Sequence, residues 1–436
     1  MRSVEEQQAR VSAAAVAPRP VRVAIAEAQG LMCAEEVVAE RPLPGFDQAA
    51  IDGYAVRSVD VLDVGESEPS DGQTGDDYLR AVPEEAEASP SGPGGVTLPV
   101  MGNIEAGART PSRLQPGQAV RVETGAPLPT LADAVLPLRW TDGGQSRVRV
   151  LRGVRSGAYV RRTGDDVQPG DVAVRAGTII AAAQVGLLAA VGRDRVLVHP
   201  RPRLSVLAVG GELVDVSRTP GNGQVYDVNS YALAAAGRDA GAEVNRIGIV
   251  SNDPKTLGEV VEGQINRAEI VVIAGAVGGA AAEAVRSVLC QLGEMEVTRV
   301  AMHPGSVQGF GQLGREGVPT FLLPANPVSA LVVFEVMVRP LIRLSLGKRQ
   351  PMRRIVQART LSPITSVVGR KGFLRGQLMR DRDTGEYLVQ ALGAPGASSH
   401  LLATLGEANC LVVIPREAEQ IRIGEIVDVA FLAQRG

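Results

Sequence analysis

The residues with the clearest chemical potential lie in one turn, the sequence L-L-P-A-N-P-V-S-A at 322–330. An apolar stretch at 320–323 predicts a strand that ends at Pro324. Pro327 then lies where a helix should begin, because proline has a fixed φ and no N–H to satisfy in the first helical turn. The free N–H groups of such a helix start favour an anion, so the turn is a candidate anion site. An ordinary proline-capped helix start is the alternative interpretation.

The composition limits the functions that the chain can have. Its 436 residues are 45% hydrophobic, which is enough for three or four separate cores. The net charge of -3 gives no general attraction for polyanions, so we expect no nucleic acid partner. The three cysteines lie far apart and match neither a disulfide framework nor a zinc site. No stretch approaches the ~20 apolar residues of a membrane span, and together these features predict a cytoplasmic protein.

Apolar runs that alternate with helical patterns predict an α/β domain in the second half of the chain. The expected strands lie at 204–209, 244–250, 270–274, 298–302 and 320–323, and the expected helices at 230–240, 254–266, 280–292 and 327–346. This alternation predicts a doubly wound sheet with mostly parallel strands. Asp253-Pro254 supports one helix start, because Asp caps a helix well and Pro suits its first position.

The remaining sequence divides into smaller modules. Helical patterns are expected at 3–16, 24–40 and 181–191, short strands in a β-rich module from 96 to 150, and a C-terminal β-barrel after a basic linker at 348–354. Ten acidic residues and one basic residue between 60 and 87 predict a flexible insert. The predicted domains are 1–45 with 150–198 (subdomain I, dimerisation), 46–149 (subdomain II, with the insert at 60–95), 199–346 (subdomain III) and 347–436 (subdomain IV).

Several longer motifs point in one direction. The segment P-G-F-D-Q-A-A-I-D-G-Y-A at 44–55, the turn at 322–330 and shorter segments at 124–127, 161–166, 224–229, 369–376 and 398–400 resemble motifs of the MoeA family, the molybdopterin molybdotransferases. The resemblance runs from Leu43 to Val429. It implies an elongated α/β multidomain fold similar to MoeA and the gephyrin E domain, with an α/β domain of the molybdopterin-binding type. It also implies a homodimer whose clefts are shared between protomers.

The resemblance implies a role for residues in each motif. Insertion of molybdate into adenylylated molybdopterin, with release of AMP and with a divalent cation such as Mg²⁺, would place catalytic roles on Asp52, Asp227 and Glu283, and metal contacts on Glu212 and Asp227. Contacts to molybdate or the pterin would fall to Thr124, Gly275, Pro304, Pro324, Asn326, Pro327, Ser329, Arg370 and Ser399. The plainer alternatives are that Asp52 and Asp227 are turn residues and that Arg370 is a charge on a strand edge.

The chain departs from the family pattern in the expected cleft. The family's S-T-G-D-E-L is A-V-G-G-E-L at 208–213, its G-G-V-S-x-G is G-A-V-G-G-A at 275–280, and its K-P-G-K-P is H-P-G-S-V at 303–307. Two lysines, three hydroxyls and a carboxylate are thereby absent, and one missing charge-stabilising donor alone typically costs ~2.7–4 kcal/mol in the transition state.

These departures lead to the expectation of a homodimeric scaffold with a degenerate cleft and no required cofactor, similar to the bacterial gephyrin-like division proteins (Glp). Its partner would be a short peptide tail of a division protein, with FtsZ as the suspected one, or a membrane receptor, and recruitment to the division site or membrane would follow. An active molybdotransferase is the alternative.

Overall fold

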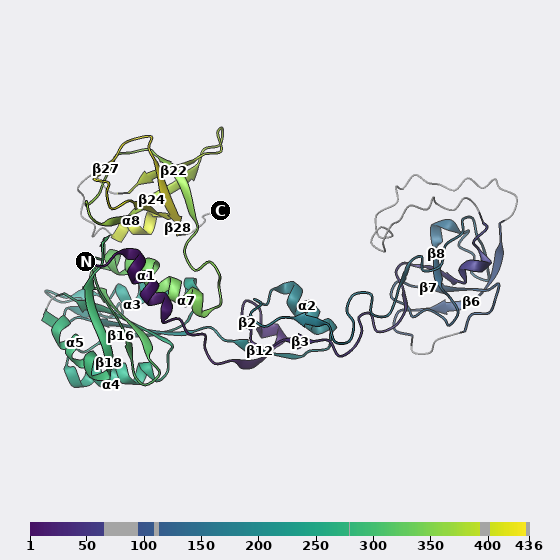
Figure 1. Cartoon of the computed structure of the whole chain (residues 1–436), viewed down its shortest axis with the longest axis horizontal. Helices are drawn as coiled ribbons and strands as arrows, with labels where there is room; N and C mark the ends of the chain where they lie inside the picture. Colours follow the sequence, from purple (N-terminus) through teal and green to yellow (C-terminus); the bar gives the residue numbers. More distant parts are fainter. Residues whose placement is uncertain (65–94, 109–112, 279, 393–401, 433–436) are drawn as a thin grey trace.

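A computed structural model describes residues 1–64, 95–108, 113–278, 280–392 and 402–432. Most of the insert expected at 60–95, and also Ser399, lie outside these residues. The chain is elongated (Figure 1), with an α/β domain and a C-terminal barrel at one end, a small connecting module in the middle and a β-rich domain at the other end. The elongated multidomain α/β architecture expected from the sequence is therefore confirmed. Within the described residues, the longest apolar helices fall short of the length that a bilayer requires.

The α/β domain is built on a six-stranded sheet of order β16-β13-β17-β21-β20-β18. Its strands are β16 (Glu243–Val250), β13 (Arg203–Val209), β17 (Ile270–Val277), β21 (Val318–Pro324), β20 (Val307–Leu313) and β18 (Gly293–Arg299). The first four are parallel to one another, while β20 and β18 add an antiparallel edge. The mostly parallel sheet was predicted, but the antiparallel hairpin was not: the strand expected at 298–302 overlaps only the last two residues of β18, and Met302 belongs to a separate short strand.

Helices cover both faces of this sheet, as a doubly wound fold requires. On one face lie α3 (Asn229–Ala240), α6 (Pro327–Val333), a π-helical turn (Phe334–Val338), α7 (Arg339–Ser345) and the N-terminal α1 (Val4–Ala13). On the other face lie α4 (Pro254–Ile265) and α5 (Ala280–Leu292). The cap predicted for α4 is confirmed, because the Asp253 side chain accepts a hydrogen bond from the Thr256 N–H and Pro254 is the first helical residue.

The β-rich domain is a five-stranded sheet of order β8-β5-β7-β6-β9, formed by β8 (Ala134–Pro137), β5 (Gly53–Val56), β7 (Ala119–Val122), β6 (Thr97–Ile104) and β9 (Arg147–Arg149). The D-G-Y-A motif supplies β5, all four residues of which are buried. Gly53 has no room for a side chain, since an added Cβ would lie 2.2 Å from the carbonyl oxygen of Leu136 in β8.

The connecting module corrects one prediction. Instead of a helix at 24–40, the structure has β1 (Val21–Ala24), a 3₁₀ turn (Ile25–Glu27), β2 (Met32–Cys33) and β3 (Val37–Val38). Gly30 has a φ of +82°, which ends helical geometry, and the β-branched pair in β3 pairs with β11 (Val172–Val174). Helix α2 (Ala182–Ala190) and β12 (Arg195–His199) complete the module, and α2 was predicted.

The C-terminal β-barrel that the sequence predicts is present, and the structure shows it to be closed and five-stranded. Its strands are β22 (Ile355–Thr360), β24 (Lys371–Arg380), β25 (Tyr387–Ala391), β26 (Cys410–Ile414) and β28 (Ile426–Phe431), and pairing of β24 with β26 closes the ring. Strand β19 (Met302–His303) of the α/β domain pairs with the start of β24. The barrel is therefore hydrogen-bonded directly to the α/β domain.

Candidate functional site

The carboxyl ends of β13, β17 and β21 define one edge of the α/β domain, because parallel strands end on the same side of a sheet. The A-V-G-G-E-L, G-A-V-G-G-A and L-P-A-N-P-V-S-A motifs span these three strand ends. The structure thus brings together the segments that carry Glu212, Gly275 and the turn beginning at Pro324. Ligands of open α/β sheets bind at this edge, so it is a candidate binding site.

The turn after β21 forms the helix start that the sequence predicts. Asn326 is the N-cap residue of α6, and its Oδ1 accepts a hydrogen bond from the Ser329 N–H at 2.9 Å. Pro327 occupies the first helical position. The preceding carbonyl, that of Ala325, accepts a hydrogen bond from Asn229 Nδ2 at 2.7 Å, which ties the turn to α3. The turn is therefore held rigidly from both sides.

Two glycines allow close backbone approaches near this edge. Gly275 has a φ of +80°, and an added Cβ would lie 2.1 Å from the carbonyl oxygen of Val209. Gly305, which follows Pro304, has a φ of +85° and would place a Cβ 2.3 Å from the Val333 side chain on α6. A side chain at either position would displace the strand or helix beside the site.

Asp227 is buried beneath the same edge. Its Oδ1 accepts the Ser230 N–H at 2.9 Å, its Oδ2 accepts the Ser230 hydroxyl, and Arg246 Nη1 lies 3.9 Å from Oδ2. Arg246 on β16 also donates to the Tyr231 hydroxyl at 3.1 Å, and its guanidinium lies over the Tyr231 ring. The Asp227 carboxylate therefore fixes the start of α3. Sequence reasoning missed Arg246 and Ser230, although the D-x-x-S spacing is a helix-cap signal.

The other two acidic candidates are exposed. The Glu212 carboxylate folds back over Gly210, whose Cβ, if present, would lie 2.8 Å from both carboxylate oxygens. Glu283, in the first turn of α5, is 79% exposed and forms an ion pair with Arg286 at 2.8 Å. Glu212 is thus available at the strand edge, while Glu283 is engaged along its own helix.

Asp52 and Thr124 meet in the β-rich domain. Oδ1 of Asp52 accepts hydrogen bonds from the Thr124 N–H at 2.8 Å and from the Thr124 hydroxyl at 2.7 Å. The hydroxyl bond first, and then the N–H bond, hold the pKa of Asp52 below its usual range. Asp52 is therefore an oriented, ionised carboxylate at neutral pH. It lies on the wall of a cavity of about 460 Å³ that also includes Arg121 and Glu123.

One chain does not assemble all the predicted residues. The β-rich domain that holds Asp52 and Thr124 is at the opposite end of the molecule from the α/β domain (Figure 1). Arg370 is on the α/β side: it immediately precedes β24, whose pairing with Met302 and His303 places it at the junction that also holds Pro304. The predicted residues thus form two separate groups.

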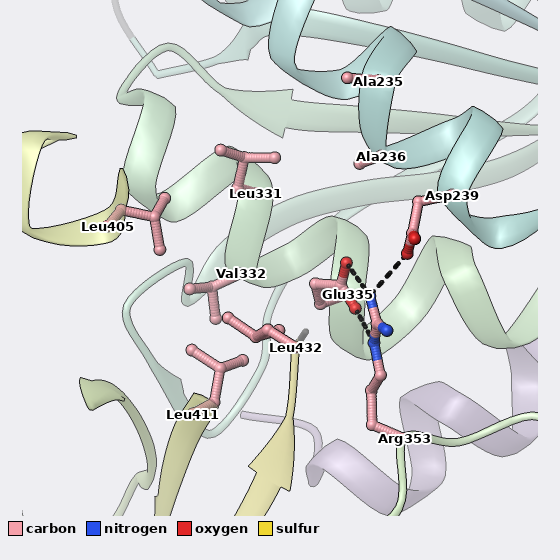
Figure 2. Close-up of a pocket in the computed structure, with 10 residues that line it drawn as sticks. All are labelled: Ala235, Ala236, Asp239, Leu331, Val332, Glu335, Arg353, Leu405, Leu411 and Leu432. Atoms are coloured by element: carbon pink, nitrogen blue, oxygen red, sulfur yellow. Dashed lines mark hydrogen bonds and ion pairs between the residues drawn. The ribbon is translucent and has the colours of Figure 1, made fainter. Parts of the chain in front are cut away.

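A second cavity, of about 480 Å³, lies between the α/β domain and the barrel (Figure 2). Apolar side chains from α6 and the barrel, among them Leu331, Leu411 and Leu432, line it. On its polar side Arg353 donates two hydrogen bonds, of 2.9 and 3.1 Å, to the Glu335 carboxylate. Sequence reasoning missed this cluster, because nothing local in the sequence pairs a helix with the linker that follows it.

Comparisons with known proteins cover the whole chain. Three family descriptions match: "MoeA N-terminal region (domain I and II)" at residues 2–192, "Probable molybdopterin binding domain" at 205–344, and "MoeA C-terminal region (domain IV)" at 357–432. Molybdopterin molybdenumtransferase 1 of Mycobacterium tuberculosis (strain ATCC 25618 / H37Rv) is 84% identical over 437 residues, which cover 100% of both chains. Molybdopterin molybdenumtransferase 2 of the same strain is 36% identical, covering 98% of this chain and 99% of the relative. The crystal structure of a molybdopterin biosynthesis MoeA protein from Pyrococcus horikoshii superposes with a TM-score of 0.78 at 29% identity and covers 99% of each chain.

Proposed function

Because the chain belongs to the MoeA family, we propose that it is a molybdopterin molybdenumtransferase, which inserts molybdate into adenylylated molybdopterin and releases AMP. The observation that carries this proposal is the 84% identity, along the full length, with a protein named molybdopterin molybdenumtransferase 1. The two substrates are anionic, and the site must bind and orient them.

The expectation of a division scaffold is corrected by the same finding. The degenerate-cleft interpretation predicted a protein that binds an FtsZ tail and needs no cofactor, whereas relatives over the full chain at 84% and 36% identity are both named as molybdenum transferases. The expectation of a scaffold rests on the motif departures alone. They therefore describe variation within the family, and assignment to the gephyrin-like division branch is withdrawn.

In the proposed reaction the α/β edge receives the pterin and the molybdate. The N-terminal turn of α6, fixed by Asn326, presents the Val328 N–H and the Ser329 hydroxyl to the oxyanion in our proposal, and Gly275 lets β17 approach β13 closely. The lysines of the family's K-P-G-K-P motif are absent here, so Arg370, which precedes β24 at the junction with β19, supplies the cation in our proposal. Asp227 holds the start of α3 and Glu283 contributes charge at the start of α5.

A magnesium ion fits this edge if its ligands come partly from the protein and partly from water and substrate phosphates. The described residues contain no group of three or more His, Cys, Asp or Glu side chains suited to a metal. Mg²⁺ commonly uses one or two carboxylates and takes its other ligands from water and substrate phosphates. Glu212, exposed at the end of β13, would hold it, with Asp227 fixing the neighbouring helix. When bound, the ion would neutralise charge on the phosphoryl oxygens.

A homodimer completes the site in our proposal. Asp52 and Thr124 lie at the far end of the elongated chain from the α/β edge (Figure 1), so a second protomer must bring them there. An isologous dimer does this twice, once in each of two equivalent clefts. Such an interface should bury roughly 2,000 Å² or more.

The activity is tested with purified protein, adenylylated molybdopterin and molybdate, by following AMP release. We expect molybdate-dependent release that falls at least about 100-fold in Glu212→Gln, the loss typical of a charge-stabilising group. Glu259→Gln on α4, on the sheet face away from the turn of α6, is the matched control and should retain activity. Absence of molybdate-dependent AMP release by the unaltered protein would overturn the proposed function.

The shared cleft is tested by mixing two inactive variants. Asp52→Asn and Glu212→Gln each damage both clefts of their own homodimers, but a mixed dimer keeps one intact cleft. After dissociation and random reassociation, about a quarter of the normal activity should return, because about half of the dimers are mixed and each has one of two clefts intact. No recovery in dimers verified as mixed would contradict sharing, as would a stable monomer in sedimentation at 45.6 kDa.

A further inference from the structure

A short two-stranded ribbon brings Glu212 to the α/β edge. Its strands are β14 (Leu213–Val214) and β15 (Val225–Tyr226), which pair in parallel. The Val225 N–H donates to the Glu212 carbonyl at 2.9 Å, so the backbone of Glu212 belongs to the ribbon. Among the described residues, none donates a hydrogen bond to the Glu212 carboxylate. Its place therefore depends on the ribbon, and two strands of two residues each need support from outside to be stable.

Arg246 on β16 supplies this support. Its Nη2 lies 3.6 Å from Oδ2 of Asp215, the residue after β14, and its Nη1 lies 3.9 Å from Oδ2 of Asp227, the residue after β15. Nη1 also donates to the Ser230 hydroxyl at 3.0 Å, and Nη2 donates to the Tyr231 hydroxyl at 3.1 Å. One guanidinium thus joins the ends of both ribbon strands to α3.

Asp215 is prepared for this contact by its own hydrogen bonds. Its Oδ1 accepts the Ser217 N–H at 3.1 Å and the Ser217 hydroxyl at 2.8 Å, and its Oδ2 accepts the Tyr231 hydroxyl at 3.0 Å. The Ser217 N–H, the Ser217 hydroxyl and the Tyr231 hydroxyl, in that order, hold the pKa of Asp215 below its usual range, so Asp215 is ionised at neutral pH. The Arg246 and Asp215 side chains are 28% and 36% exposed, and salt screens partly buried charges less than fully exposed ones. The attraction between them therefore persists at physiological salt.

The backbone of β16 is shaped to aim the Arg246 side chain. In the pairing of β16 with β13, Arg246 lies opposite Val206 and Gly248 lies opposite Leu207, so Ile247 is an extra residue in β16. Such bulges re-aim the side chains beside them. Gly248 has a φ of +83°, and an added Cβ would lie 3.1 Å from Arg246 Nη1. The glycine therefore leaves room for the guanidinium to reach the ribbon.

We propose that Arg246 is a positioning residue, which clamps the ribbon and thereby holds the Glu212 carboxylate in place for the magnesium ion. This inference rests on the proposed function, in which Glu212 binds that ion. Arginine suits the task because its fork of donors reaches the ribbon and α3 together, whereas the single ammonium group of lysine does not. Removing a group that orients a metal ligand typically costs about 10–100-fold in metal affinity, so Arg246 acts on magnesium through Glu212.

Hydrogen exchange tests the clamp without reference to activity. The amides of Val225 and Asp227 donate to backbone carbonyls across the ribbon, at 2.9 Å each. In the full-length protein, Arg246→Met should speed exchange in peptides from 211–228 at least about tenfold, because the charge-assisted contacts that oppose local opening are lost. Arg203→Met is the matched control: Arg203 forms its ion pair at the other end of β13, so its replacement should leave exchange in these peptides unchanged.

The second measurement is AMP release at increasing magnesium concentration. Arg246→Met should raise the magnesium concentration for half-maximal rate about tenfold or more. The rate at saturating magnesium should largely recover, because bound metal then holds Glu212 in place. A change that only destabilised the domain would lower the rate at every magnesium concentration. Arg246→Lys should lie between Arg246→Met and the unaltered protein, and Arg203→Met should leave the half-maximal concentration unchanged.

A second variant decides the question if Arg246→Met fails to fold, which circular dichroism would reveal. Asp215→Ala alters a more exposed residue and removes the outer anchor of the ribbon, so exchange and magnesium dependence should change in the same direction. Unchanged exchange at 211–228 in both variants overturns the clamp, and faster exchange with an unchanged magnesium requirement overturns the positioning role. Absence of molybdate-dependent AMP release by the unaltered protein overturns the proposed function instead, and the exchange data still decide whether Arg246 clamps the ribbon.

Discussion

Removing the Glu335 carboxylate should loosen the junction between the α/β domain and the barrel. Glu335 is 12% exposed and binds Arg353, 18% exposed, with two hydrogen bonds, while Arg339, 10% exposed, lies 3.8 Å away. In Glu335→Ala, Asp239 alone remains to neutralise two largely buried guanidinium groups. Breaking a buried pair from one side costs ~3–5 kcal/mol, because the remaining charge stays buried without its counterion.

This cost becomes a large shift in thermal unfolding. At about 2–4 °C for each kcal/mol in a domain of this size, the melting temperature should fall by about 6 °C or more. Far-UV circular dichroism follows the helices of the α/β domain, whereas Trp140 fluorescence follows the β-rich domain and should show an unchanged transition. Glu386→Ala is the control, because its pair with Arg359 is about half exposed and should contribute ~0–1 kcal/mol. Equal shifts for Glu335→Ala and Glu386→Ala would refute the argument that burial of the junction pair makes it important.

Three further outcomes follow from local geometry. Gly275→Ala should abolish activity and lower stability, because its Cβ would lie 2.1 Å from the Val209 carbonyl oxygen; an active, equally stable variant, measured by AMP release and thermal melting, would contradict this. Thr124→Val removes the main cause of the lowered Asp52 pKa, so the acidic limb of the pH–activity profile should move to higher pH, towards the usual value of about 4. Thr124 stabilises the ionised form of Asp52. Its contribution to the stability of the folded protein is therefore complete above the unfolded pKa of about 4, and it is lost as the pH falls through the lower pKa of the folded state. Of the three cysteines only Cys290 is exposed, so a single thiol should react with iodoacetamide in the folded protein as judged by mass spectrometry.

Sequence reasoning succeeded where structure is specified locally. The cap at Asp253, the proline after Asn326 and the alternation of strand and helix each determine an element within a few residues, and the structure has those elements. It failed at 24–40, where alanine and glutamate favour a helix but pairing of β3 with the distant β11 decides the outcome. Contacts such as Arg246 with Ser230 join separate elements, so no local pattern predicts them.

A local motif does not show which of its residues are buried, and for this reason the motif departures led to the wrong expectation of a division scaffold. Two of the three hydroxyls counted as lost from the cleft correspond to Ala208 and Val209, which the structure places inside β13 at 0% and 2% exposure. A side chain there packs in the core of the sheet, and its replacement by an apolar one avoids burying a polar group without a partner. Gly210 and Glu212, which follow the same strand, are retained at the edge. A count of matching motif letters gives equal weight to core and edge positions, whereas only edge positions can contact a ligand. The departures that remain at the edge are those at Gly211, Gly278, His303 and Ser306, and the last two locate where this chain differs from the family motif in how it supplies positive charge.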